Sequence, residues 1–238
     1  MRILLYGFML FSTINLFAMH VNREIHLLAM QASQKINEEL LFTATLNNDA
    51  KKIKELLDKK TVNINARNED GKTPVCLAVA RGKNEALKEL LRYNSDVNLP
   101  DNDGWTPLKK AANYNRIESA RLLLVAGAKP NQADKEGYTP LLNAYQNLEM
   151  TRLLLEAGAD ANHSAPDGRT ALYMALGDSK IDVVELLVKH GAQDSSRCIS
   201  NGFNARDLAN ANARDTHSSF GITEAQKCAN FLNQKFGE

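Results

Sequence analysis

The residue types that most often carry chemistry are scattered along this chain. The three cysteines and five histidines share no short spacing; they are Cys76, Cys198, Cys228, His20, His26, His163, His190 and His217. An odd, sparse set of cysteines without a Cys-x-x-Cys pair predicts neither a metal site nor a disulfide framework. If the chain is exported, Cys198 and Cys228 could pair in one disulfide bridge. No Gly-rich phosphate loop and no Gly-x-Ser-x-Gly elbow occurs. We therefore predict no catalytic residue, no metal and no cofactor.

A second set of residues suits recognition better than catalysis. Trp105 is the only tryptophan, and it directly follows a glycine. Lys72, Tyr138 and Arg169 also directly follow glycines. Trp, Tyr and Arg are enriched among the residues that dominate binding energy at interfaces. If these positions are equivalent, the four side chains form a row in the order cation, aromatic, aromatic, cation.

The spacing of two markers indicates what positions this row. Glycines recur at a nearly constant interval, at Gly71, Gly104, Gly137, Gly168 and Gly202, and only the step from Gly137 to Gly168 is shorter. Asparagines recur at the same intervals as the glycines, at Asn65, Asn98, Asn131 and Asn162. Periods of about 20–50 residues mark repeat architectures, in which each unit contacts mainly its neighbours.

Each repeat predicts two helices. The glycine supplies the positive φ of a tight turn. Thr106 and its equivalents Thr73, Thr139 and Thr170 are good N-cap residues, and a proline at the next position, as at Pro107, suits the first helical residue. A longer, leucine-rich helix follows and ends at a glycine such as Gly127, or once at Asn94, both of which tolerate a left-handed cap.

The segment Gly-Trp-Thr-Pro-Leu that begins at Gly104, together with its copies, resembles the ankyrin repeat over about residues 40–238. The resemblance implies an all-α solenoid of helix–turn–helix units joined by hairpin-like turns. We predict six units, 40–70, 71–103, 104–136, 137–167, 168–201 and 202–238, preceded by an N-terminal helical cap at 19–39. Unit 137–167 is short, and we expect the missing residues to come from the turn at Gln146–Asn147.

The chain departs from the family pattern at the histidine of Thr-Pro-Leu-His. The residues found there are Cys76, Lys109, Leu142, Tyr173 and Asp207. Lys109 and Lys110 would place two cations on a first helix. Either their stems cover apolar surface while the ammonium groups reach water, or the pair takes part in recognition.

The resemblance also implies where a partner would bind. In ankyrin arrays the partner usually meets the turn tips and the exposed side of the first helices. Carried over position by position, the predicted partner-binding residues are Lys72, Arg81, Asn102, Asp103, Trp105, Tyr114, Tyr138 and Arg169. If Trp105 and Tyr138 face the partner, their replacement by alanine weakens binding and leaves the melting temperature nearly unchanged; otherwise both rings pack in the stack.

Residues 1–18 differ from the rest of the chain. A single Arg2 precedes the nearly apolar run from Ile3 to Phe11, and a mixed segment ends at Ala18. This layout predicts a signal peptide cleaved after Ala18, with no membrane span left in the mature chain. The alternatives are a membrane anchor and true initiation at Met19, which would leave the chain in the cytoplasm.

Composition narrows the class of function. With 29 basic and 28 acidic residues the net charge is +1, whereas nucleic-acid binding calls for a clustered basic excess. We expect a non-catalytic scaffold for protein–protein interaction, exported to the periplasm or secreted from a bacterium. The alternatives are a protective or inhibitory partner of a periplasmic enzyme, an effector acting on a host protein, and an enzyme whose site has no recognisable motif.

Overall fold

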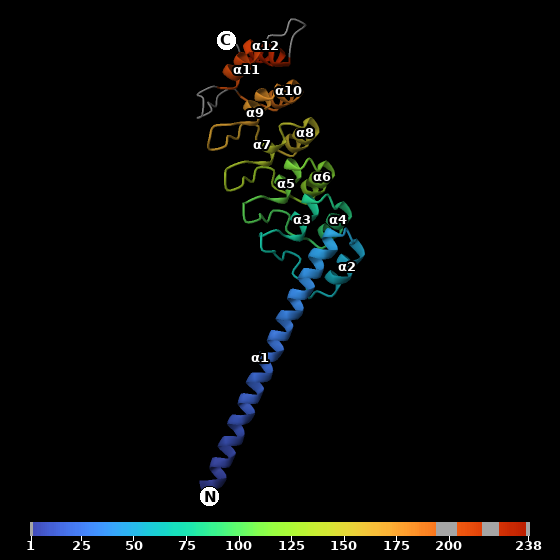
Figure 1. Ribbon diagram of the computed structural model, residues 1–238, viewed down its shortest axis with the longest axis vertical. Helices are drawn as coiled ribbons and strands as arrows, with labels where there is room; N and C mark the ends of the chain where they lie inside the picture. Colours follow the sequence, from blue (N-terminus) through green and yellow to red (C-terminus); the bar gives the residue numbers. More distant parts are fainter. Residues whose placement is uncertain (1, 194–203, 216–223, 237–238) are drawn as a thin grey trace.

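The computed structural model describes residues 2–193, 204–215 and 224–236. In these ranges the chain forms twelve α-helices that stack as successive pairs, with the connecting loops projecting from one side (Figure 1). The first helices of the pairs are the end of α1 (Arg2–Leu46), α3 (Pro74–Ala80), α5 (Pro107–Asn113), α7 (Pro140–Ala144), α9 (Ala171–Gly177) and α11 (Ala205–Asp215). The second helices are α2 (Ala50–Asp58), α4 (Asn84–Arg92), α6 (Ile117–Val125), α8 (Leu148–Glu156), α10 (Ile181–Lys189) and α12 (Glu224–Phe236). The fold is the all-α repeat solenoid that the sequence predicts.

The first helices begin at the predicted caps, with one exception. Thr73, Thr106 and Thr170 each accept a hydrogen bond from the backbone N–H three residues on. Thr139 also precedes its helix, but its buried hydroxyl has no partner among the described residues. The second helices end as expected, because Gly127 has a φ of +88° and Asn94 a φ of +56°.

The recurring asparagines join one unit to the next. Asn98 accepts a hydrogen bond from the backbone of Lys129 at 2.8 Å and donates to the carbonyl of Gly127 at 3.2 Å. Asn131 bonds in the same way to Asp160 and Gly158. Each side chain thus satisfies backbone groups just past a helix end, where no helical partner exists. The period of the asparagines is therefore the period of the contacts between units.

The short unit loses its residues from a helix and not from the turn. α7 has five residues, whereas α3 and α5 each have seven. Three residues, Tyr145 to Asn147, join α7 to α8, and three residues also join α5 to α6. The expected deletion at Gln146–Asn147 was therefore wrong. Asn147 caps α8 by accepting from the backbone of Met150, so shortening the turn would cost that cap.

α1 is one continuous helix that runs away from the stack (Figure 1). No proline precedes Pro74, and α1 ends only before Asn48, whose φ is +59°. Leu41 and Ala44 are buried against the repeats. Residues 19–36, which we expected to cover the first unit, are exposed along their whole length. The apolar residues Ile25, Leu28 and Ile36 are therefore 58–63% exposed.

Two sequence predictions lie beyond this description. Cys198 and the boundary between the fifth and sixth units, at 201/202, fall outside the described residues. Within residues 2–193, 204–215 and 224–236, no helix is both long and apolar enough to cross a membrane.

Candidate partner-binding surface

An aspartate at the base of each central loop sets the positions of Trp105 and Tyr138. Asp101 Oδ1 accepts hydrogen bonds from the backbone of Asp103 at 3.1 Å and of Trp105 at 2.9 Å. Asp134 Oδ1 accepts in the same way from Glu136 and, at 2.9 Å, from Tyr138. The two aromatic residues therefore leave equivalent loops at equivalent points, as the regular spacing of the glycines implied.

The same two aspartates hold the lysines of α5. Lys110 Nζ lies 2.5 Å from Asp101 Oδ2, and Lys109 Nζ pairs with Asp134 Oδ2 in the loop that leads into the following unit. The lysine side chains are only 2% and 5% exposed. The interpretation that these lysines reach out to water is therefore wrong. Burial favours a raised pKa for the Asp101 carboxyl, but the hydrogen bonds from Lys110 and from the Trp105 backbone outweigh it and lower the pKa.

Aromatic rings lie over these buried ammonium groups. Lys109 Nζ is 4.5 Å and Lys110 Nζ is 5.2 Å from the centroid of the Trp105 ring. The Tyr138 ring belongs to the next loop, and its centroid lies 5.6 Å from Lys109 Nζ. These distances are typical of cation–π contacts. Trp105, which is half-buried, therefore packs in the stack with at least one of its faces.

Tyr138 belongs to a second polar cluster, one loop further on. Its hydroxyl donates to Asp167 Oδ2 at 2.9 Å and accepts from Arg169, whose Nε lies 2.6 Å from the same carboxylate oxygen. The Arg169 guanidinium is 5.5 Å from the Tyr138 ring. Burial, then the bond to Asp167, raises the pKa of Tyr138, while the bond from Arg169 lowers the pKa of Asp167. The predicted row thus runs from Trp105 through Lys109 to Tyr138 and Arg169, and of its members Tyr138 and Arg169 bond to each other.

An open pocket of about 600 Å³ collects most of the remaining predicted residues. It lies where the loops before α3 and α5 meet the ends of those two helices. Its lining residues are Lys72, Leu77, Ala80, Arg81, Asp101, Asp103, Trp105, Lys110, Tyr114 and Arg116. Five of the eight predicted partner-binding residues are in this set. Asn102 is not; it bonds to the preceding loop through the carbonyls of Asp70 and Glu69.

Arg116 is a lining residue that the sequence reasoning missed. It occupies the position that Lys83 has in the preceding unit, directly before a second helix, so the repeated cation was a signal in the sequence. Its guanidinium packs over Gly82, where a side chain would place its first carbon 3.3 Å from Arg116 Cζ. Gly82 also has a φ of +64°, so glycine suits this position on two counts.

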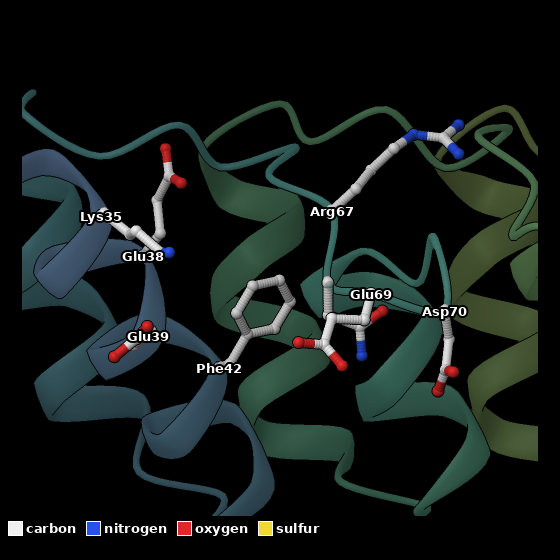
Figure 2. A pocket seen from close by; sticks show the side chains of 8 residues that line it. Lys35, Glu38, Glu39, Phe42, Arg67, Glu69 and Asp70 are labelled. Carbon is white, nitrogen blue, oxygen red and sulfur yellow. The ribbon is translucent and has the colours of Figure 1, made fainter. Parts of the chain in front are cut away.

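A second pocket, between α1 and the first loop, has the opposite charge. Figure 2 shows Glu38 and Glu39 of α1 on one side, Glu69 and Asp70 of the loop on the other, and Phe42 between them. Lys35 and Arg67 also line it. In the described residues, no group of three or more His, Cys, Asp or Glu side chains is placed to hold a metal ion. Of the predicted partner-binding residues, none lines this pocket.

Comparison with known proteins agrees with the geometry. A family model described as ankyrin repeats (three copies) matches residues 40–134 and 122–198. The last predicted unit, 202–238, lies outside these matches, so the matches do not confirm the count of six units. No curated protein matches the chain. The stacked helix pairs and a family match covering more than half of its length show that the chain belongs to the ankyrin-repeat family.

Proposed function

We propose that this chain is a non-catalytic scaffold that binds another protein through its loop surface. We use that name for the eight residues Lys72, Arg81, Asn102, Asp103, Trp105, Tyr114, Tyr138 and Arg169. The observation that carries the proposal is the clustering of five of them around one open pocket. Ankyrin-repeat proteins generally bind partners and do not catalyse reactions, which supports the same conclusion.

The chemistry of the loop surface suits a protein partner. Tyr114 is 47% exposed and offers a large ring that loses little conformational entropy on binding. Arg81 is exposed beside it. The pocket is open and mixes rings with charged groups, whereas small-molecule sites are mostly enclosed and apolar.

Export is the second part of the proposal. The layout of residues 1–18 supports a cleaved signal peptide, with the mature chain beginning at or near Met19. N-terminal sequencing of the native protein tests this part. A chain that retains Met1 in a membrane fraction would contradict it, and a cytoplasmic chain that starts at Met19 would replace cleavage by initiation.

The binding proposal is tested by crosslinking the full chain in its native cells and identifying captured proteins by mass spectrometry. Tyr114→Ala should reduce capture of the main partner at least roughly tenfold, as expected for an interface hot spot. Val125→Ala is the matched control, because Val125 is 87% exposed at the end of the second helix α6. Equal capture by both variants would contradict binding through the loop surface.

A further inference from the structure

The pocket beside Tyr114 contains two arginines that have no partner in the described part of the chain. Four cations line this pocket, but Lys72 pairs with Asp70 at 2.8 Å and Lys110 pairs with Asp101. Arg81 and Arg116 are exposed, and neither side chain makes a hydrogen bond or ion pair within the described residues. The one acid of the lining that is not neutralised in this way is Asp103. The pocket therefore keeps a positive excess.

The two arginines come from neighbouring units and meet at one place. Arg81 is the C-cap residue that follows α3, and the Arg116 guanidinium packs over Gly82, the next residue after Arg81. The positive φ of Gly82 turns the chain just after Arg81, and the absence of a side chain on Gly82 leaves room for the second guanidinium. Both arginines line this pocket, and together they suit a carboxylate, which can accept two parallel hydrogen bonds from one guanidinium and a further bond from the other.

Aromatic surface lies next to these charges. Trp105 and Tyr114 line the same pocket, together with the aliphatic Leu77 and Ala80. A ligand that places a carboxylate on the arginines therefore has apolar surface within reach. An acidic residue next to a large apolar residue, in an extended protein segment, fits this arrangement.

We propose that this pocket recognises an acidic segment of the partner protein, with a Glu or Asp side chain bound by Arg81 and Arg116 and an adjacent apolar side chain against Trp105 and Tyr114. The inference rests on the proposed function, because it names the chemistry that the loop surface selects. Charge complementarity favours an acidic protein over nucleic acid, since a nucleic-acid site needs a basic surface far larger than this one pocket.

A random-peptide phage library selected on the full-length protein is the first test. Peptides recovered on the wild-type chain should be enriched in Glu and Asp next to large apolar residues, relative to the starting library. The double variant Arg81→Gln, Arg116→Gln should lose that enrichment. Recovered peptides with no excess of acidic residues, or with the same excess on the double variant, would overturn the proposal.

The second test measures affinity with blocked synthetic peptides taken from that selection. The acidic peptide should bind at least roughly tenfold more weakly to Arg81→Gln or Arg116→Gln than to wild type, the loss expected for a charge-assisted contact. The same peptide with Gln and Asn in place of its acids should bind weakly to all variants. Arg152→Gln is the matched control, because Arg152 is an exposed arginine of the second helix α8. An equal loss in Arg152→Gln, or tight binding only after phosphorylation of the peptide, would overturn the proposal.

The crosslinking experiment separates this inference from the proposed function. If Arg81→Gln still captures the partner while Tyr114→Ala does not, the loop surface binds the partner but acid recognition is wrong. If neither substitution changes capture, the loop surface itself is the wrong site. If both substitutions abolish capture while the control is unchanged, the two proposals stand together.

Discussion

Two pairs of cations in this molecule have the same charge and opposite surroundings. Lys109 and Lys110 of α5 are buried, each paired with an aspartate and covered by the Trp105 ring. Arg81 and Arg116, at the ends of the turns between first and second helices, are exposed. All four belong to the same two neighbouring units. The difference in burial and pairing depends on the adjacent loops. An aspartate from each of two loops pairs with a lysine of α5, whereas no aspartate pairs with either arginine among the described residues.

The comparison separates a stabilising charge from a recognising one. Lys109 bonds to Asp134, whose other oxygen accepts from the backbone of Tyr138 in the next unit, so the pair contributes to the contact between consecutive units, on which repeat proteins depend. Removing one partner of such a buried pair leaves an uncompensated charge. Removing an exposed cationic side chain changes the free energy of unfolding little, because water already solvates the charge. Substitutions of the buried ion pairs should therefore change the free energy of unfolding, whereas substitutions of the exposed arginines should change binding.

The largest effect is expected for Asp134→Ala. It leaves the Lys109 ammonium buried without its carboxylate, and breaking a buried pair typically costs about 3–5 kcal/mol. Urea unfolding followed by circular dichroism measures the loss. The double variant Lys109→Met, Asp134→Leu is the control and should recover the part of the loss that comes from the unpaired ammonium group, but not the part that comes from the bonds of Asp134 to the backbone of Glu136 and Tyr138. A single variant as stable as wild type would mean that water reaches the ammonium group.

Trp105→Ala should have the next largest effect. Removing the ring uncovers both ammonium groups, and a desolvated cation–π contact is worth about 2 kcal/mol. This replaces the expectation from sequence that the melting temperature stays nearly unchanged. Tyr114→Ala is the comparison, because its ring is exposed and should leave the melt unaltered. Equal melting temperatures for the two variants would mean that Trp105 serves recognition alone.

Acid should weaken the stabilisation that the buried Asp101 carboxylate contributes. The pKa of Asp101 is lower in the folded chain than in the unfolded chain, so its contribution to stability is present above the unfolded pKa of about 4 and is lost as the pH falls through the lower folded value. Between pH 7 and that range, the stability of wild type should fall more steeply than that of Asp101→Asn. Parallel curves from urea unfolding at a series of pH values would refute this contribution.

The smallest effect on stability is expected for the exposed cations. Arg81→Ala and Arg116→Ala should each change the free energy of unfolding by less than about 0.5 kcal/mol, as is usual for surface substitutions. The same urea titration used for Asp134→Ala measures it. A loss comparable to that of Asp134→Ala would show that the arginines stabilise the stack, and the comparison would then fail.

The repeat pattern and its local rules could be read from the sequence. The periods of Gly104 and Asn98 placed the loops, whereas the bonds that Asn98 makes to the next unit became visible only in the structure. Thr106 as a cap and Asn94 as a helix end follow from preferences that act over one turn of chain. The position of Trp105 and Tyr138 in one row followed from the equal spacing of the units.

The surroundings of individual side chains could not be read in this way. Lys109 pairs with Asp134 in the loop at the far end of its own unit, and Arg116 packs over Gly82 of the preceding unit. Periodicity places the backbone of such residues but does not say which long side chain reaches which loop. The spacing of the repeats also did not show that residues 19–36 of α1 are exposed or that α7 is the short element of its unit. By itself, the sequence determined the fold and brought the predicted partner-binding residues to the loops of successive units. Only the tertiary structure decided which cations beside those loops are already neutralised, since burial and pairing depend on residues that are distant along the chain.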